Sequence, residues 1–120
     1  MIVALWITAI LLALVYLAAG GMKAATPREK LLTNMGWVED FSAVQVKAIG
    51  VLEVAGALGV ILPLATGIAP VVTGVAALAL VLVQAVAIAV HVRRGEQNAL
   101  AVNGVLLALA GAVAVLFFLS

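Results

Sequence analysis

The chain has 120 residues, of which 68% are hydrophobic and 9% are charged, and its mean hydropathy is +1.39. A protein of this size has too small an interior to bury so many apolar side chains, so the composition excludes a soluble enzyme and a disordered chain. Six basic and five acidic residues give no basic excess for binding nucleic acid. The lack of cysteine and the single histidine argue against an intrinsic metal or cofactor site. We therefore expect a small integral membrane protein in contact with the lipid bilayer.

Four apolar segments lie at about residues 2–22, 44–64, 68–91 and 99–119. Each is close to the ~20 residues that cross a hydrocarbon core as a helix, and backbone groups in lipid must bond within their own segment. The first segment ends in Leu17-Ala18-Ala19-Gly20, which resembles a signal-peptide cleavage site, but no basic residue precedes it and we expect a membrane span. We predict an all-α fold in which residues 1–120 form a single transmembrane domain, a polytopic four-helix bundle.

The segment at about residues 27–38 differs from the spans because it is amphipathic. Thr26-Pro27-Arg28-Glu29 predicts a capping box at the start of a helix. Apolar residues then recur at helical spacing, at Leu31, Leu32, Met35 and Val38, with Trp37 beside them. This pattern predicts a short helix that lies in the membrane interface between the first two spans.

Three further connections have clear turn signals. Ser42 and Gln45 predict a capping box at the start of the second span. Prolines and glycine at 63, 67 and 70 predict a short uncharged turn into the third span. Arg93-Arg94-Gly95-Glu96 predicts a short charged turn into the fourth.

Charge predicts how the chain lies in the membrane. With four crossings, one side receives all the basic residues, namely Lys23, Arg28, Lys30, Lys47, Arg93 and Arg94. The positive-inside rule then places the charged connections in the cytoplasm and both termini outside a plasma or inner membrane. We expect Arg93 and Arg94 to serve this topology alone.

The polar residues within the spans predict a binding pocket, because each is costly in lipid. Glu53 lies on a face of small residues, including Gly50, Gly56 and Ala57, and such faces normally point into a helix bundle. Gln84 is expected at a similar height on the third span. The full set of candidates is Tyr16, Lys23, Lys47, Glu53, Gln84, His91 and Asn103. All belong to the half nearest the charged connections, which predicts a polar pocket that opens to the cytoplasm and is closed on the outside.

Each candidate also has a structural interpretation. Glu53 would serve as a buried anchor if it bonded to Gln84 or paired with Lys23 or Lys47. Gln84 and Asn103 would hold helices together, and His91 would cap a helix end. The small residues Gly104, Ala108 and Ala112 predict a packing face that would also suit a homo-oligomer.

The segment from Lys47 to Pro63, KAIGVLEVAGALGVILP, resembles the signature of DoxX-like membrane proteins. Ala19–Lys23, Gly36-Trp37 and His91–Glu96 fit the same family, and the resemblance covers nearly the whole chain. It implies a four-helix membrane protein; the family takes its name from a subunit of a thiosulfate:quinone oxidoreductase, and some relatives are thought to assist membrane redox complexes. The family's polar positions fall on Lys23, Lys47, Glu53 and His91 in this sequence.

Four functions compete at this point. The first is a binding and accessory subunit that holds a quinone or lipid in the pocket and docks a membrane or cytoplasmic oxidoreductase. The second is a small-solute transporter that works as an oligomer, with Glu53 coupling to protons. The third is an enzyme with Glu53 and His91 as an acid–base pair, which their difference in depth disfavours. The fourth is a purely structural membrane partner.

Overall fold

The computed structural model describes residues 2–33 and 35–120, and at residue 98 the backbone only. These residues form α1 (Ile2–Ala25), α2 (Arg28–Leu31), the 3-10 helix η1 (Gly36–Asp40), α3 (Ala43–Thr66), α4 (Val71–Arg94) and α5 (Gln97–Leu119). Within the described ranges there is no strand. α1, α3, α4 and the part of α5 from Ala99 onward are long and apolar enough to cross a membrane. The prediction of an all-α, four-helix membrane bundle is confirmed.

The two turns between spans show why helix ends differ from those predicted. α3 continues past Pro63 to Thr66, because the Pro63 carbonyl still accepts the Gly67 amide at 2.9 Å. Gly67 then adopts a left-handed φ of 73° that ends the helix. Ala69 also has a positive φ, of 47°, and Pro70 forms the N-cap of α4. α4 therefore begins at Val71 and not at residue 68, and it runs to Arg94, where Gly95 ends it with a φ of 72°.

The capping box at Ser42 is confirmed. The Ser42 hydroxyl accepts the Gln45 amide at 3.1 Å, and the Gln45 side chain accepts the Ser42 amide at 2.9 Å. The capping box predicted at Thr26 is wrong, because the N-cap of α2 is Pro27, whose ring offers no side-chain acceptor.

The short helix predicted within residues 27–38 is present but is divided into two pieces. The structure has one turn of α2, then a break, and then η1; residue 34 in that break lies outside the described residues. The Thr33 hydroxyl donates to the Lys30 carbonyl at 2.7 Å, a local bond that competes with helix continuation. The apolar spacing still reports burial correctly, since Leu31 and Val38 pack with Val46 in a small cluster.

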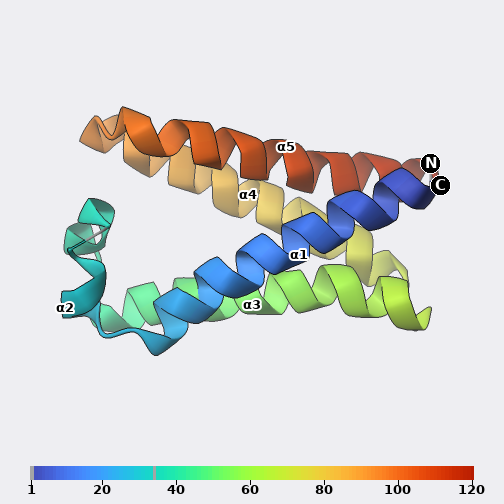
Figure 1. The fold of residues 1–120 in the computed structure, drawn as a ribbon, viewed down its shortest axis with the longest axis horizontal. Helices are drawn as coiled ribbons and strands as arrows, with labels where there is room; N and C mark the ends of the chain where they lie inside the picture. The colour runs from blue at the N-terminus through green and yellow to red at the C-terminus, as the bar shows by residue number, and fades with distance from the viewer. Residues whose placement is uncertain (1, 34) are drawn as a thin grey trace.

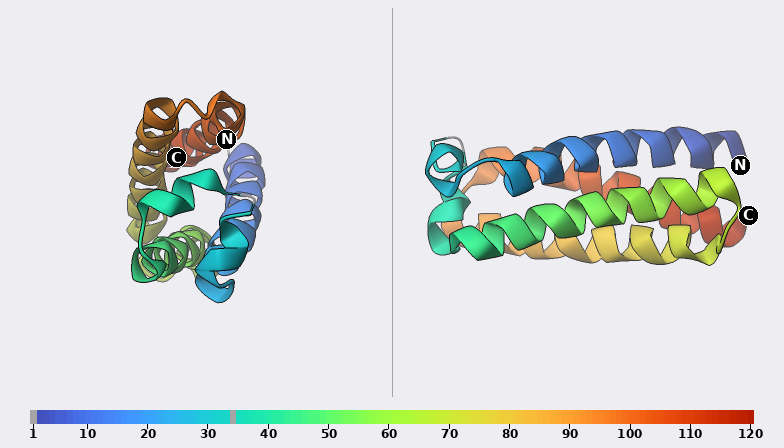
Figure 2. Two further views of the ribbon diagram at one scale, coloured as in Figure 1. Left: turned by 90° about the vertical axis from the view of Figure 1, so that its left-hand side faces the viewer. Right: turned by 90° about the horizontal axis from the view of Figure 1, so that it is seen from below.

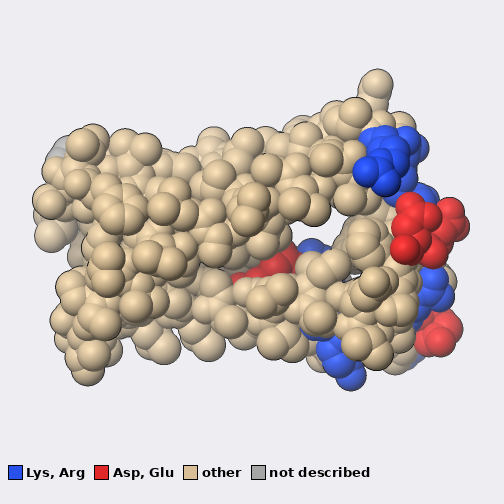
Figure 3. All heavy atoms as spheres, turned by 180° about the vertical axis from the view of Figure 1, so that it is seen from behind, with Lys and Arg blue, Asp and Glu red and all other residues tan. Residues whose placement is uncertain are grey.

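The four long helices form two antiparallel pairs, α1 with α3 and α4 with α5 (Figure 1). Both chain termini lie at one end of the bundle, which we call the termini end. At the opposite end, η1 and α2 lie across the helix ends (Figure 2). Lysine, arginine, aspartate and glutamate gather at this second end, which we call the charged end (Figure 3).

The main hydrophobic core joins all four long helices and extends from the termini end to the middle of the bundle. Its α1 members are Leu5, Ala9, Leu12, Ala13 and Tyr16, and its partners on the other helices include Val60, Leu80 and Val113. The one buried threonine of this region, Thr73, donates its hydroxyl to the Val60 carbonyl at 2.8 Å. Toward the charged end the two helix pairs are separated by an opening, and acidic and basic atoms are visible deep inside it (Figure 3).

Candidate functional site

The structure buries most of the predicted polar candidates. Tyr16, Glu53, Gln84 and Asn103 are all below a tenth exposed. Lys23 and His91 are partly buried, whereas Lys47 is exposed. The candidates do not form one site. Lys23 and Glu53 make one contact, Tyr16 and Gln84 make a second, and His91 and Asn103 line a cleft at the charged end.

The first contact is an ion pair between α1 and α3. Lys23 Nζ lies 2.6 Å from Glu53 Oε1, and the two side chains are 14% and 3% exposed. The predicted inward orientation of Glu53 is confirmed, and among its proposed partners the structure selects Lys23. Lys47 lies on an exposed position of α3 and takes no part in this pair.

Close backbone packing makes the ion pair geometrically feasible. A Cβ atom on Gly50 would lie 2.6 Å from the Gly20 carbonyl oxygen, and one on Gly20 would lie 2.9 Å from Glu53 Cβ. Only glycine permits this approach of α1 to α3 at both positions. The approach brings Lys23, one turn below Gly20 on α1, within reach of Glu53.

The second contact joins the two helix pairs. Gln84 Nε2 on α4 donates to the Tyr16 hydroxyl on α1 in a fully buried hydrogen bond. Gln84 was expected to contact Glu53. In the structure Glu53 pairs with Lys23, and the partner of Gln84 is Tyr16. The amide oxygen of Gln84 is buried and has no hydrogen-bond partner among the described residues. Tyr16 also belongs to the main core, so this bond marks where apolar packing ends and the opening begins.

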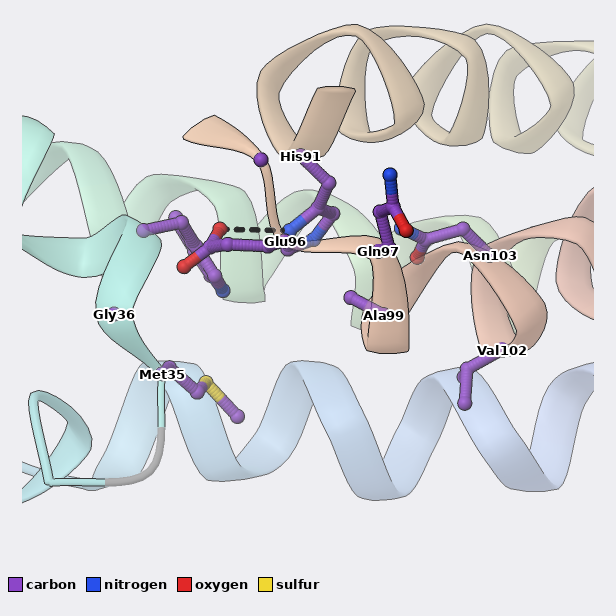
Figure 4. A pocket seen from close by; sticks show the side chains of 10 residues that line it. Met35, Gly36, His91, Glu96, Gln97, Ala99, Val102 and Asn103 are labelled. Atoms are coloured by element: carbon purple, nitrogen blue, oxygen red, sulfur yellow. Dashed lines mark hydrogen bonds and ion pairs between the residues drawn. The ribbon is translucent and has the colours of Figure 1, made fainter. Parts of the chain in front are cut away.

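Above these contacts lies a cleft of about 540 Å³ at the charged end. Met35 and Gly36 form one side, and His91, Glu96, Gln97 and Asn103 form the other (Figure 4). The remaining lining residues are Trp37, Gly95, Ala99 and Val102. The cleft thus combines residues from the segment before α3 with the turn between α4 and α5.

Two polar side chains that line this cleft carry a hydrogen-bonding atom that no described residue engages. Asn103 is 8% exposed, and its amide nitrogen has no acceptor in the described part of the chain. His91 Nδ1 lies 3.0 Å from Glu96 Oε1, which orients the ring and leaves Nε2 as its other hydrogen-bonding atom (Figure 4). Glu53 and His91 have different partners, which agrees with the expectation that their difference in depth disfavours an acid–base pair.

Ion pairs hold η1 over the cleft. Arg94 reaches Asp40 at 2.6 Å and Glu39 at 3.3 Å, both on η1, and it also lies 3.3 Å from Glu96. The expectation that Arg94 serves topology alone is therefore wrong. Its two partners on η1 are more than 50 residues away in the chain, so no local spacing could have revealed them.

Arg28 fixes the end of η1, and Trp37 on η1 lines the cleft. The Arg28 guanidinium donates to the carbonyls of Val38, Glu39 and Phe41, at 2.8–3.3 Å, and so binds the end of η1. The Trp37 ring, which lines the cleft, lies 5.5 Å from Lys23 Nζ. Glu53 does not line the cleft itself, but its ion pair holds Lys23 next to the Trp37 ring, which does.

Sequence reasoning missed the contribution of Met35, Gly36, Glu96 and Gln97 to the cleft. The glycine at position 36 is a sign of close packing, because a Cβ there would lie 2.8 Å from Glu96 Oε2. The other three have no pattern that distinguishes them from ordinary loop residues. Within residues 2–33 and 35–120, no three potential metal ligands come together.

Comparison with known proteins identifies the family. The family model described as the DoxX-like family matches residues 7–113. No curated protein and no solved structure matches the chain significantly. Because the family model covers most of the chain, this multi-pass membrane protein belongs to the DoxX-like family.

Proposed function

We propose that this DoxX-like protein is an accessory subunit of a membrane redox system, and that it binds a small amphiphile with a hydrogen-bond-accepting head group, such as a quinone. The observation that carries the proposal is the unpartnered Asn103 amide nitrogen in the cleft at the charged end. A buried donor without an acceptor is unfavourable, by roughly 1–3 kcal/mol, and a ligand carbonyl would remove that cost.

The cleft has the size and chemistry that such a head group needs. Its volume of about 540 Å³ lies within the ~300–1,000 Å³ of most small-molecule sites. Met35, Trp37 and Val102 supply apolar and aromatic surface, while Asn103 and His91 supply polar atoms at two separate points. A ring with oxygen atoms on opposite sides would use both.

The position of the cleft also suits a lipid-soluble ligand. Val102 lines the cleft and is 61% exposed on the outer surface of α5, among the apolar residues of a membrane span. A ligand dissolved in the bilayer would therefore enter past Val102 without crossing water. Lipid is the competing occupant of the same route.

We further propose that the charged end faces the cytoplasm and docks the oxidoreductase partner there. All six basic residues lie at or near this end, as the positive-inside rule expects of a cytoplasmic surface. The chain contains no cysteine, so single-cysteine variants would report sidedness directly. Lys30→Cys should react with an impermeant maleimide only in inverted vesicles, and Ser120→Cys only in right-side-out vesicles; the reverse pattern would refute the orientation.

Tryptophan fluorescence offers a direct test of the binding site. The protein has two tryptophans, Trp37 in the cleft and Trp6 on α1 near the termini end. In a Trp6→Phe background, titration with a short-chain ubiquinone should quench Trp37 in a saturable way. The Trp37→Phe protein, which keeps Trp6, should show only the weak linear quenching of collisions in the micelle.

The matched variants are Asn103→Leu and Gly104→Ala, both made in the Trp6→Phe background. Asn103→Leu should weaken binding about twofold to tenfold, since a lost hydrogen bond is worth ~0.5–1.5 kcal/mol. Gly104→Ala should bind normally, because a Cβ there would meet nothing within 4 Å and Gly104 does not line the cleft. Equal affinity of Asn103→Leu and its background would refute the site, and solute flux in proteoliposomes would favour the transport alternative.

A further inference from the structure

A second cleft, of about 300 Å³, lies beside the junction of α1 and α2. Its lining includes the three basic residues Lys23, Arg28 and Lys47, and the other lining residues are Ala24, Ala25, Thr26, Pro27, Ala43 and Val46. No acidic residue lines it. It is separate from the cleft proposed for the amphiphile, with which it shares no lining residue.

The positive charge of this second cleft is only partly neutralised. Lys23 is paired with Glu53. Arg28 donates to backbone carbonyls, which orient the guanidinium but do not cancel its charge. Lys47 is exposed, and in the described part of the chain neither Arg28 nor Lys47 forms an ion pair with a carboxylate. Two uncompensated cations therefore line one small cavity.

The backbone adds to this charge in the same direction. Ala43, the first residue of α3, lines the cleft, so the amino end of a 24-residue helix borders it. The partial positive charge of such an end favours an anion. The arrangement of two cations and a helix amino end around a cavity suits a phosphate group.

The location of the cleft decides which phosphate is expected. Lys23 lies in the last turn of α1 and Lys47 in the first turns of α3, where two apolar spans meet the charged end. In a bilayer this level is that of the lipid head groups, where basic residues attract anionic lipids. We propose that the second cleft binds the phosphate of an anionic phospholipid head group.

The experiment measures lipid selectivity with spin-labelled lipids. The full-length protein is reconstituted in phosphatidylcholine, and electron spin resonance gives the association of spin-labelled phosphatidylglycerol relative to spin-labelled phosphatidylcholine. The wild type should prefer phosphatidylglycerol. Lys47→Gln should lower this preference about fivefold, the factor that ~1 kcal/mol per basic residue represents, and Lys47→Glu should lower it further.

Lys30→Gln is the matched control, because Lys30 is exposed at the same end but does not line the cleft. It removes the same charge and should leave most of the preference intact. An equal loss in Lys30→Gln and Lys47→Gln would refute the cleft, since general surface potential would then explain the selectivity. Inorganic phosphate should not displace the lipid more than chloride does at equal ionic strength; specific displacement would overturn the lipid assignment in favour of free phosphate.

The Lys47 substitutions should not unfold the protein. Lys47 is exposed and has no hydrogen bond or ion pair from its side chain in the described structure, so its substitution leaves the bundle contacts in place. Unfolding of the Lys47→Gln protein in mixed micelles, compared with that of the wild type, gives an independent check of folding.

Discussion

The four helices pack together closely at the termini end of the bundle but not at the charged end. At the termini end, all four helices share one apolar core, and there Gly74 at the start of α4 packs against Phe117 and Phe118 at the end of α5. At the charged end, α1 and α3 remain in close contact through Gly20 and Gly50, but the opposing pair lies apart and η1 spans the space between. The comparison teaches that contacts within a pair and contacts between pairs have different chemical origins at this end. Glycine contact and an ion pair join α1 to α3, whereas a buried hydrogen bond from Gln84 to Tyr16 and the ion pairs of Arg94 with η1 connect the two pairs.

The largest effect should come from breaking the buried ion pair. Lys23→Met leaves the Glu53 carboxylate, only 3% exposed, without its cation, and such losses typically cost about 3–5 kcal/mol. Glu53→Gln should cost less, because the longer Lys23 side chain starts from a more exposed position and can extend toward water. Unfolding of the purified protein in mixed micelles measures both.

The double variant Lys23→Met/Glu53→Leu serves as the control for this prediction. Replacing both charges with apolar groups should restore much of the stability lost in Lys23→Met. A double variant as unstable as the single one would mean that shape, and not charge, holds α1 to α3 at the charged end.

The core at the termini end should be nearly as sensitive to lost volume. Leu12 is fully buried there, and Leu12→Ala should lower the free energy of unfolding by about 2–5 kcal/mol through the cavity it leaves. Leu11→Ala, at the neighbouring exposed position, should change it by far less. Similar losses in the two variants would show that the four helices are not joined by one core at this end.

A smaller effect is expected from added volume between α1 and α3. Gly20→Ala would place a Cβ 2.6 Å from the Gly50 carbonyl oxygen, a backbone atom that cannot turn aside. We expect a loss of about 1–3 kcal/mol from this overpacking. Gly21→Ala, one residue later on the same helix, meets nothing within 4 Å and should be neutral or slightly stabilising. If both substitutions are tolerated, the close approach of the two helices is incorrect.

The smallest effect on overall stability should follow from cutting the ion pairs between α4 and η1. Arg94→Gln removes the contacts with Glu39 and Asp40, and exposed pairs add little stability. The amide of Val38 in η1, which donates to the Met35 carbonyl, should nevertheless exchange hydrogen several times faster. Arg93→Gln, which changes the neighbouring exposed arginine, is the control and should leave this exchange unchanged. Unchanged exchange in Arg94→Gln would mean that η1 is held by its apolar contacts alone.

Much of the fold could be predicted because lipid allows few solutions. Length and hydropathy determined the four helices, and the Ser42–Gln45 spacing located the start of α3 correctly. The start of α4 was missed because Ala69 adopts a left-handed backbone conformation, which its residue type gives no reason to expect. The break after α2 was missed because helical spacing of apolar residues reports which side chains are buried, and not whether the backbone between them is continuous.

The candidate site was less predictable for a related reason. The small residues around Glu53 indicated correctly that it faces inward, but spacing along one helix cannot say which neighbour fills the opposite position. That is why Lys23, Lys47 and Gln84 remained equivalent partners until the packing of Gly20 against Gly50 was known. The Arg94 contacts with η1 depend on the path of a loop, which no periodic pattern encodes.

The pairing of Lys23 with Glu53 has a consequence for how the chain is made. The two residues lie on α1 and α3, which are consecutive membrane spans of this chain, and a lone charge in lipid is costly for either helix. When α3 lies beside α1 in the bilayer, the opposite charges neutralise each other without a contact from α4 or α5. The amino-terminal hairpin is thus equipped to leave the translocon as a finished unit, against which the later hairpin assembles.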